Sequence, residues 1–169
     1  RFLLFQGPSP KTFTDVWLLP TDGDRTPVPI VQTEFFEGSA RFSPDGRWIV
    51  YQSNVSSRSE IYVRGFDPAS PGAPSGGVIQ VSADGGVNPK WRRDGKELFF
   101  TALDGALMAV DVATTPTFRA GTVRTLFRKP PTVPWDPAAD GQRFLLAVPT
   151  AERGQMSLTV VLDWGTERK

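Results

Sequence analysis

Residues 40–54 read Ala-Arg-Phe-Ser-Pro-Asp-Gly-Arg-Trp-Ile-Val-Tyr-Gln-Ser-Asn, and this stretch decides the fold because its pattern returns along the chain. In its middle, residues 43–46 (Ser-Pro-Asp-Gly) have the composition of a tight turn, since proline presets φ and glycine accepts positive φ. The residues that end at Phe42 and those that begin at Arg47 then run antiparallel. The stretch therefore predicts a β-hairpin.

The same pattern returns twice more. Residues 89–100 (Pro-Lys-Trp-Arg-Arg-Asp-Gly-Lys-Glu-Leu-Phe-Phe) place a basic residue, an aromatic residue and Asp-Gly at the same spacing. Residues 138–146 repeat the turn and the return strand, and residues 1–4 (Arg-Phe-Leu-Leu) are identical to residues 143–146. If these identical residues are equivalent, the return strands, which are the strands that follow each turn, begin at Arg1, Arg47, Lys96 or Glu97, and Arg143. The period is then 46 to 50 residues.

The composition agrees with a fold made of strands and turns. The 169 residues include 16 Gly and 16 Pro, without a long helical pattern of apolar residues. Four strands per period of this length are typical of a β-propeller blade. We predict an all-β fold of four-stranded antiparallel blades, about three and a half in number, forming an incomplete propeller. The predicted boundaries are a partial blade at 1–39, blades at 40–86 and 87–131, and a partial blade at 132–169. A β-sandwich or barrel with accidental turn similarity is the alternative.

Charge and residue types exclude several functions. Nineteen Lys and Arg against 18 Asp and Glu leave a formal charge of +1, so no global field attracts nucleic acid or an anionic membrane. The chain has no His and no Cys, which excludes a His general base, a Ser-His-Asp triad, thiolate chemistry and His or Cys metal ligands. No apolar run is long enough for membrane insertion by this segment. We therefore expect no catalytic residue, no metal and no cofactor.

Residues 42–51 (Phe-Ser-Pro-Asp-Gly-Arg-Trp-Ile-Val-Tyr) and 60–63 (Glu-Ile-Tyr-Val) resemble the TolB-like propeller repeat, which is related in form to Trp-Asp repeats. More narrowly, residues 15–20 (Asp-Val-Trp-Leu-Leu-Pro) and 158–164 (Leu-Thr-Val-Val-Leu-Asp-Trp) are similar to the C-terminal propeller of large bacterial proteins, often behind a kinase or regulator domain. The resemblance implies a sensory or scaffold part in a periplasmic or extracytoplasmic compartment. No kinase motif is present, and Ala138-Ala139 replace the usual Ser/Thr-Pro before Asp140. Since no Asp-Gly turn precedes Arg1, we expect a piece of a longer protein.

Two groups of charged residues have structural interpretations. Asp45, Asp94 and Asp140 could form a carboxylate ring for a cation, but an Asp before Gly more often caps its own turn. Residues 90–93 (Lys-Trp-Arg-Arg) combine basic and aromatic side chains as a nucleic-acid site does. Their place in the repeat instead predicts Trp91 in the core and the two arginines in an exposed turn.

The candidate binding site lies where each blade's first strand begins. The connecting loops are expected at residues 37–41, 85–90 and 132–136. They contribute a mixed polar set with one aromatic residue, which suits a peptide or protein loop at the channel mouth. The set is Glu37, Arg41, Asn88, Lys90, Trp135 and Asp136. The alternative is that these loops are merely solvated.

The sequence thus favours a non-catalytic module for protein or ligand binding. Two alternatives remain open: a substrate-filtering propeller of a prolyl-oligopeptidase-like peptidase, and a half-ring that closes by homodimerisation. Open blade edges favour self-association in the second case.

Overall fold

The computed structural model of the protein describes residues 1–8, 13–73, 75–149 and 156–161. These residues form fourteen strands in four antiparallel sheets, and the part of the chain that is described contains no helix. The all-β prediction is confirmed. Among the same residues there is accordingly no helix with the length and apolar character to span a membrane. The chain divides into two compact units, Arg1–Pro89 and Lys90–Lys169, which we describe separately.

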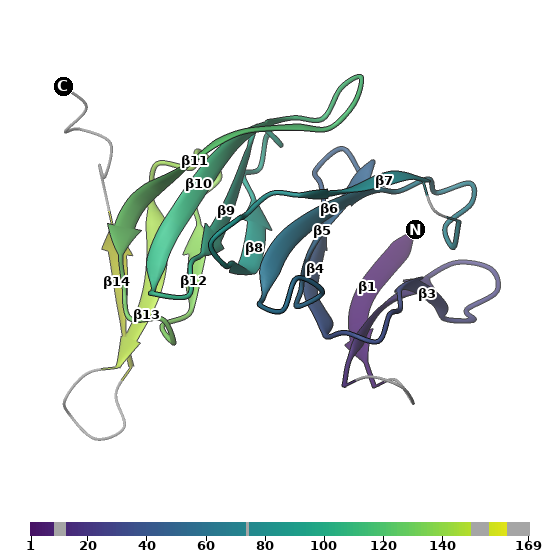
Figure 1. The fold of residues 1–169 in the computed structure, drawn as a ribbon, viewed down its shortest axis with the longest axis horizontal. Coiled ribbons are helices and arrows are strands. Elements are labelled where there is room, and N and C mark those ends of the chain that lie inside the picture. The colour runs from purple at the N-terminus through teal and green to yellow at the C-terminus, as the bar shows by residue number, and fades with distance from the viewer. Residues whose placement is uncertain (9–12, 74, 150–155, 162–169) are drawn as a thin grey trace. The chain divides into compact units, whose positions relative to one another are not determined.

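The first unit contains two sheets (Figure 1). The first sheet has the order β1 (Phe2–Gly7), β2 (Asp15–Pro20), β3 (Val28–Val31). The second has the order β4 (Glu37–Phe42), β5 (Trp48–Ser53), β6 (Glu60–Gly65), β7 (Ser75–Gln80). In both sheets, sequential strands are neighbours, as predicted for blades.

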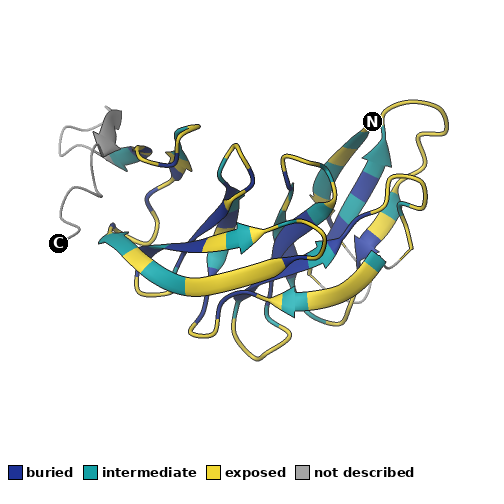
Figure 2. Cartoon of the chain, turned by 90° about the horizontal axis from the view of Figure 1, so that it is seen from above, coloured by how far each residue is buried: buried dark blue, intermediate teal, exposed yellow. Residues whose placement is uncertain are grey.

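The second unit repeats this arrangement, and the division between the units falls within β8. Its first sheet consists of β8 (Val87–Trp91), β9 (Glu97–Thr101), β10 (Ala106–Ala113) and β11 (Arg119–Arg128), in sequential order. Its second sheet consists of β12 (Trp135–Pro137), β13 (Phe144–Pro149) and β14 (Met156–Val161). Middle strands such as β5 and β9 are almost wholly buried, whereas the outermost strands β7 and β11 are largely exposed (Figure 2).

The repeated Asp-Gly turns are capped by their own aspartates. Each carboxylate accepts a hydrogen bond from the backbone N–H two residues later. The pairs are Asp45 with Arg47 (3.1 Å), Asp94 with Lys96 (3.0 Å) and Asp140 with Gln142 (2.9 Å). The following glycines adopt φ values of 69°, 74° and 69°, which favour residues without a Cβ. The structural interpretation of the three aspartates is therefore confirmed.

The register of β13 corrects the alignment of the two identical tetrapeptides. The carbonyl oxygens of Trp48, Glu97 and Arg143 each accept the N–H of the residue that follows the preceding strand, at 2.8, 2.9 and 2.8 Å. Arg143 is thus equivalent to Trp48, not to Arg47 as the sequence identity predicts. The counterpart of Arg47 in the first sheet is Arg1. The carbonyl oxygen of each accepts a hydrogen bond from the backbone N–H of the residue that follows the next strand, which is Phe66 (2.8 Å) for Arg47 and Thr21 (3.0 Å) for Arg1. The identical tetrapeptides are therefore offset by one residue, which places the same side chains on opposite faces of their sheets.

Each unit has a core between its two sheets. The first unit buries one apolar cluster: Val16, Leu18, Ile30, Val31, Ile49, Tyr51, Tyr62 and Phe66, with Phe2, Leu4, Ala40 and Phe42 packed against it. The second unit buries another: Phe99, Leu107, Ala109, Val133, Trp135, Phe144 and Leu146. Tyr51 stacks on Tyr62 with 5.8 Å between ring centroids, and burial raises the pKa of Tyr51 to about 12. Face-to-face packing of successive sheets is the arrangement expected of neighbouring blades.

Candidate binding site

The segments predicted as loops around the candidate site are in large part strands. β4 begins at Glu37, β8 at Val87 and β12 at Trp135. Their backbones pair with the next strand, for example Glu37 with Ser53. Small and polar residues in these segments suggested loops, but strand pairing is decided by the partner strand rather than by composition. The loop prediction is therefore wrong for most of these positions.

Glu37 is buried, with 1% of its surface exposed. Its Oε1 accepts hydrogen bonds from the hydroxyls of Thr33 and, at 3.2 Å, of Ser53. Its Oε2 is buried without a hydrogen-bond partner in the described residues, and burial raises the pKa of the carboxyl group. The expectation that Glu37 faces a ligand at the surface is thus corrected. Its side chain is a structural part of the first unit.

Trp135 is also buried, at 5% exposure, although it was predicted as an exposed aromatic contact. Its indole N–H donates to the hydroxyl of Thr101 at 2.9 Å. Lys90 Nζ lies 5.0 Å from the centroid of the Trp135 ring, and donates to the Trp135 carbonyl and to the Asp136 carboxylate. The structure therefore brings Lys90, Trp135 and Asp136 together, but as partners of one another. A lysine charge held by a ring and a carboxylate is already satisfied within the unit.

Asn88 and Arg41 are exposed, as predicted, and Asn88 belongs to a second group of contacts. Ser39 Oγ lies within hydrogen-bond distance of Asn88 Oδ1, at 3.4 Å. The two residues occupy equivalent places on β4 and β8 and have nearly equal positive φ values, 53° and 54°. We call Ser39 and Asn88 the inner-strand pair. Both side chains of the pair and Arg41 belong to the first strands of sheets, while Glu37 on the same strand is buried.

Two glutamines hold the inner-strand pair from the sheets that precede it. The backbone N–H of Ser39 donates to Gln6 Oε1 at 3.2 Å, and that of Asn88 donates to Gln52 Oε1 at 2.9 Å. At Gly38, a Cβ would lie 2.4 Å from Gln6 Nε2, so glycine makes room for this contact. Sequence reasoning missed the glutamines and Ser39. The available signal was that Gln6 and Gln52 follow Arg1 and Arg47 at the same distance.

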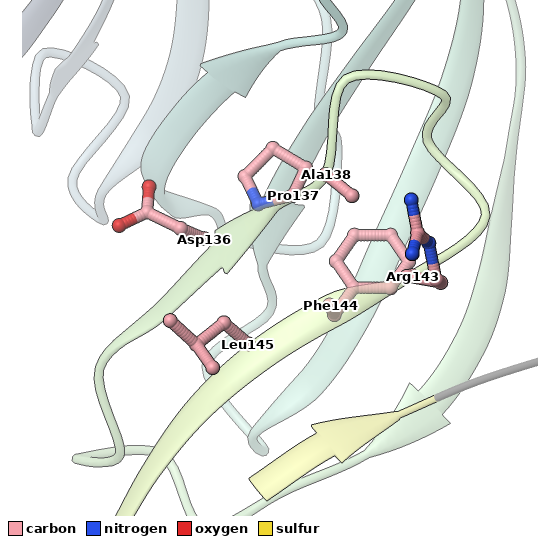
Figure 3. A pocket seen from close by; sticks show the side chains of 6 residues that line it. All are labelled: Asp136, Pro137, Ala138, Arg143, Phe144 and Leu145. Atoms are coloured by element: carbon pink, nitrogen blue, oxygen red, sulfur yellow. The ribbon is translucent and has the colours of Figure 1, made fainter. Parts of the chain in front are cut away.

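A hollow of about 300 Å³ lies on the β12–β13 sheet (Figure 3). It is lined by Asp136, Pro137, Ala138, Arg143, Phe144 and Leu145. Arg143 is paired with Asp140 at 3.1 Å, and Leu145 is 40% exposed. The lining is therefore mainly apolar, with charged groups that already have partners at its margin.

A second hollow, of about 330 Å³, is polar and lies in the first unit. It is lined by Ser56, Ser57, Arg58, Glu60 and Gln80. Arg58 donates to the buried carboxylate of Glu60 at 2.7 Å, and Glu60 also accepts the hydroxyl of Ser82. The arginine is thus neutralised, which removes the attraction for an anion. In the described part of the chain, no three carboxylates come close enough together to hold a metal ion.

Comparison with known proteins identifies the fold of this chain. No protein-family model matches the sequence, and no curated protein sequence matches it. A solved structure assigned as TolB, from Agrobacterium tumefaciens, is 20% identical, with a TM-score of 0.57 over 75% of this chain and 45% of that one. The β-propeller domain of Cps50 (Swd1) from Myceliophteria thermophila is 11% identical, with a TM-score of 0.54 over 87% of this chain and 53% of that one. The chain has a β-propeller fold.

A third similar propeller is the periplasmic gluconolactonase PpgL of Pseudomonas aeruginosa. It is 16% identical, with a TM-score of 0.54 over 95% of this chain and 53% of that one. The chain therefore spans about half the length of these propellers. At such identities the likeness concerns the fold alone. It confirms the predicted resemblance to TolB-like and Trp-Asp-repeat propellers and the prediction of an incomplete propeller.

Proposed function

We propose that this chain is part of a non-catalytic propeller module that binds a protein or peptide, and that the inner-strand pair contributes to the binding surface. The observation that carries the proposal is the hydrogen-bonded pair of the half-buried Ser39 and the exposed Asn88, held by glutamines from the preceding sheets. Following the resemblance of the sequence, we place the module as a sensory or scaffold part of a larger bacterial protein.

The backbone of the inner-strand pair is held in a costly conformation. A non-glycine residue at positive φ costs on the order of 1–3 kcal/mol, less for Asn than for Ser. Each Gln6 or Gln52 hydrogen bond offsets part of this cost, at about 1 kcal/mol. The result is two polar side chains whose positions are set before any ligand arrives. Such preorganisation lowers the entropic cost of binding, and Ser and Asn suit the varied hydrogen bonds of a peptide.

The pairing of two other buried carboxylates, Glu97 and Glu60, supports a non-catalytic module. Glu97 is 4% exposed and is paired with both Arg92 and Arg124. Glu60 is fully buried and is paired with Arg58. Both carboxylates are thus occupied by arginine side chains of the same unit.

A peptide selection tests the proposal. A random peptide library displayed on phage is selected against the immobilised chain, and enriched peptides are measured against the variant Ser39→Gly/Asn88→Gly. Glycine keeps positive φ and the backbone N–H groups that donate to the glutamines, but removes both side chains. We expect affinity to fall about tenfold, as for the loss of one to two neutral hydrogen bonds, without loss of thermal stability. Val78→Ser, at a 59% exposed position on β7, is the matched control and should bind as the wild type does.

Two results would overturn the proposal. One is a selection in which no peptide sequence is enriched. A substrate-filtering propeller of a peptidase would give this result, because it must admit peptides of many sequences. The other is equal binding to wild type and to the double glycine variant. The non-catalytic part is tested separately, with D-glucono-δ-lactone and a chromogenic prolyl peptide as substrates. Turnover of either by the purified chain would refute it.

A further inference from the structure

The last strand of the second sheet, β7, has one edge without a neighbouring strand (Figure 1). The N–H of Val81 donates to the carbonyl of Ile61 on β6 at 2.8 Å. In an antiparallel ladder, alternate residues bond to the same neighbour. The register therefore directs the backbone groups of Ile79 toward β6, and those of Val78 and Gln80 away from it. We call the outward backbone groups of Val78 and Gln80 the free edge of β7.

The free edge of β7 is open to solvent. Val78 is 59% exposed, and Gln80 is exposed as well (Figure 2). Successive sheets of a propeller stack face to face, so a further blade does not cover the outer edge of a last strand. The two residues thus present two N–H and two C=O groups to a ligand, in the alternation that an extended backbone matches.

The last strands of two other sheets have features that discourage a further strand. β3 contains Pro29, which has no N–H, and the carbonyl of Ile30 accepts a hydrogen bond from Arg64. Prolines, bulges and charges are common means by which an edge strand avoids pairing. From Val78 to Gln80, β7 has none of them, and its register shift with β6 lies before Val78. By contrast, β11 has two register shifts and three charged residues, Arg119, Arg124 and Arg128.

We propose that the free edge of β7 binds an extended segment of another protein, which adds to the four-stranded sheet as a fifth strand. The backbone of the segment bonds to Val78 and Gln80, as in other complexes formed by strand addition. Side chains opposite each other in a ladder lie on the same face, so the residue opposite the exposed Val78 is apolar. This site shares no residue with the inner-strand pair, and it is independent of the proposed function.

A second copy of β7 fits this edge less well than a segment of different sequence. Two copies related by a twofold axis can pair through Val78 in two antiparallel registers. The first places the polar Gln80 of one copy opposite the apolar Val78 of the other. The second places Gln80 opposite Gly76, whose φ of 75° departs from the extended conformation of a strand. A segment of another protein is subject to neither constraint.

An NMR titration of the chain with a defined peptide tests the proposal. The probe is acetyl-Lys-Thr-Thr-Val-Thr-Lys-amide, whose valine lies opposite Val78 when the peptide adds antiparallel. We expect chemical-shift changes centred on the amides of Val78 and Gln80, and slower hydrogen exchange at both when the peptide is bound. The amides of Ile79 and Val81 should be protected already in the free chain, because they bond to β6.

N-methylated peptides test the backbone contact without changing the protein. Methylation at the valine removes an N–H that faces Val78, and should weaken binding about fivefold or more, as for the loss of one hydrogen bond. Methylation at the threonine just before the valine removes an N–H that faces away from β7. This matched peptide should bind as the unmethylated probe does.

Two variants of Val78 test the same contact from the side of the protein. Val78→Pro removes the outward N–H without removing a bond to β6, and edge strands accept proline at such positions. It should also weaken binding about fivefold or more. Val78→Thr is the matched control, because it keeps the N–H and the β-branched shape, and it should keep most of the affinity.

Several results would overturn the proposal. One is a probe that shifts amides elsewhere, or none at any peptide concentration. Another is equal loss of binding with the two methylated peptides, or with Val78→Pro and Val78→Thr. A third is protection of the Val78 and Gln80 amides that grows with the concentration of the chain alone, since a second copy would then occupy the edge. The variant Ser39→Gly/Asn88→Gly should bind the probe as the wild type does, so the two binding proposals can fail separately.

Discussion

Replacing Phe144 by alanine is expected to cause a large loss of stability. The side chain is fully buried in the second unit. Its ring lies 5.2 Å from Phe99, 5.6 Å from Phe127 and 6.1 Å from Trp135, measured between centroids. A buried Phe→Ala change costs roughly 3–5 kcal/mol, and aromatic pairs add about 0.5–1.5 kcal/mol each. We therefore expect Phe144→Ala to lower the free energy of unfolding by about 4–5 kcal/mol.

The next residue supplies the matched control. Leu145 is 40% exposed, so Leu145→Ala removes a side chain that is only partly withdrawn from water. Complete burial of a leucine contributes about 1.5–3 kcal/mol, and partial burial correspondingly less. We expect a loss of about 1–2 kcal/mol for this variant in the monomer. The two neighbours thus differ by several kcal/mol because they point to opposite faces of β13.

Urea unfolding followed by tryptophan fluorescence measures both variants. The midpoint should shift strongly for Phe144→Ala and weakly for Leu145→Ala, with unchanged dependence on urea concentration. Experiments at low protein concentration keep self-association out of the comparison. A loss for Leu145→Ala that equals or exceeds the loss for Phe144→Ala would refute the reasoning. It would mean that β13 is shifted by one residue, since such a shift exchanges the two faces of a strand.

Three further variants test single contacts. Burial raises the pKa of Glu37 above the ordinary value of 4.5. The free energy of unfolding of the wild type, relative to that of Glu37→Gln, should therefore increase as the pH falls from neutral through the raised pKa, and should level off below pH 4.5. Urea unfolding at several pH values measures this difference. The Arg92 side chain is the main cause that lowers the pKa of Asp94 to about 2, so Asp94 stabilises the fold above pH 3.8 and loses this effect as the pH falls toward 2. Because Asp94 is 44% exposed, Asp94→Asn should cost only about 0.5–1 kcal/mol at neutral pH, and a constant difference down to pH 2 would contradict the assignment. Gln52→Ala removes the acceptor of the Asn88 N–H and should cost about 1 kcal/mol and speed hydrogen exchange at that amide, whereas unchanged exchange would argue against the contact.

The fold could be predicted from the sequence because its signals are local. The Ser-Pro-Asp-Gly turn at 43–46 contains within itself the proline, the aspartate and the glycine that shape it. The register of β13 could not be predicted in the same way. Identity between residues 1–4 and 143–146 pointed to a common register, but register depends on hydrogen bonds to the neighbouring strands, which a tetrapeptide does not contain.

The candidate site was less predictable because its side chains find partners far away in sequence. Glu37 is a charged residue type that is seldom buried, yet it lies next to the hydroxyl of Ser53, 16 residues later. Lys90 finds its carboxylate 46 residues later, in Asp136. Trp135 finds its acceptor 34 residues earlier, in Thr101. Residue type alone could not tell the buried Glu37 and Trp135 from the exposed Arg41 and Asn88.

The two sheets of the second unit show why a pair like Ser39 and Asn88 is not continued at the start of β12. Here Thr101 takes the place of Gln52 in the repeat, and Pro134 takes the place of Asn88. Proline has no N–H, so the backbone hydrogen bond that Ser39 and Asn88 each donate to a glutamine cannot form at position 134. The indole N–H of Trp135 instead donates to the hydroxyl of Thr101, and the link between successive sheets is kept by a buried side chain. A junction of this kind places no polar side chain at positive φ on the surface. Restoring one there would require both an N–H at position 134 and a longer acceptor at position 101, and for this reason the proposed binding surface centres on Ser39 and Asn88.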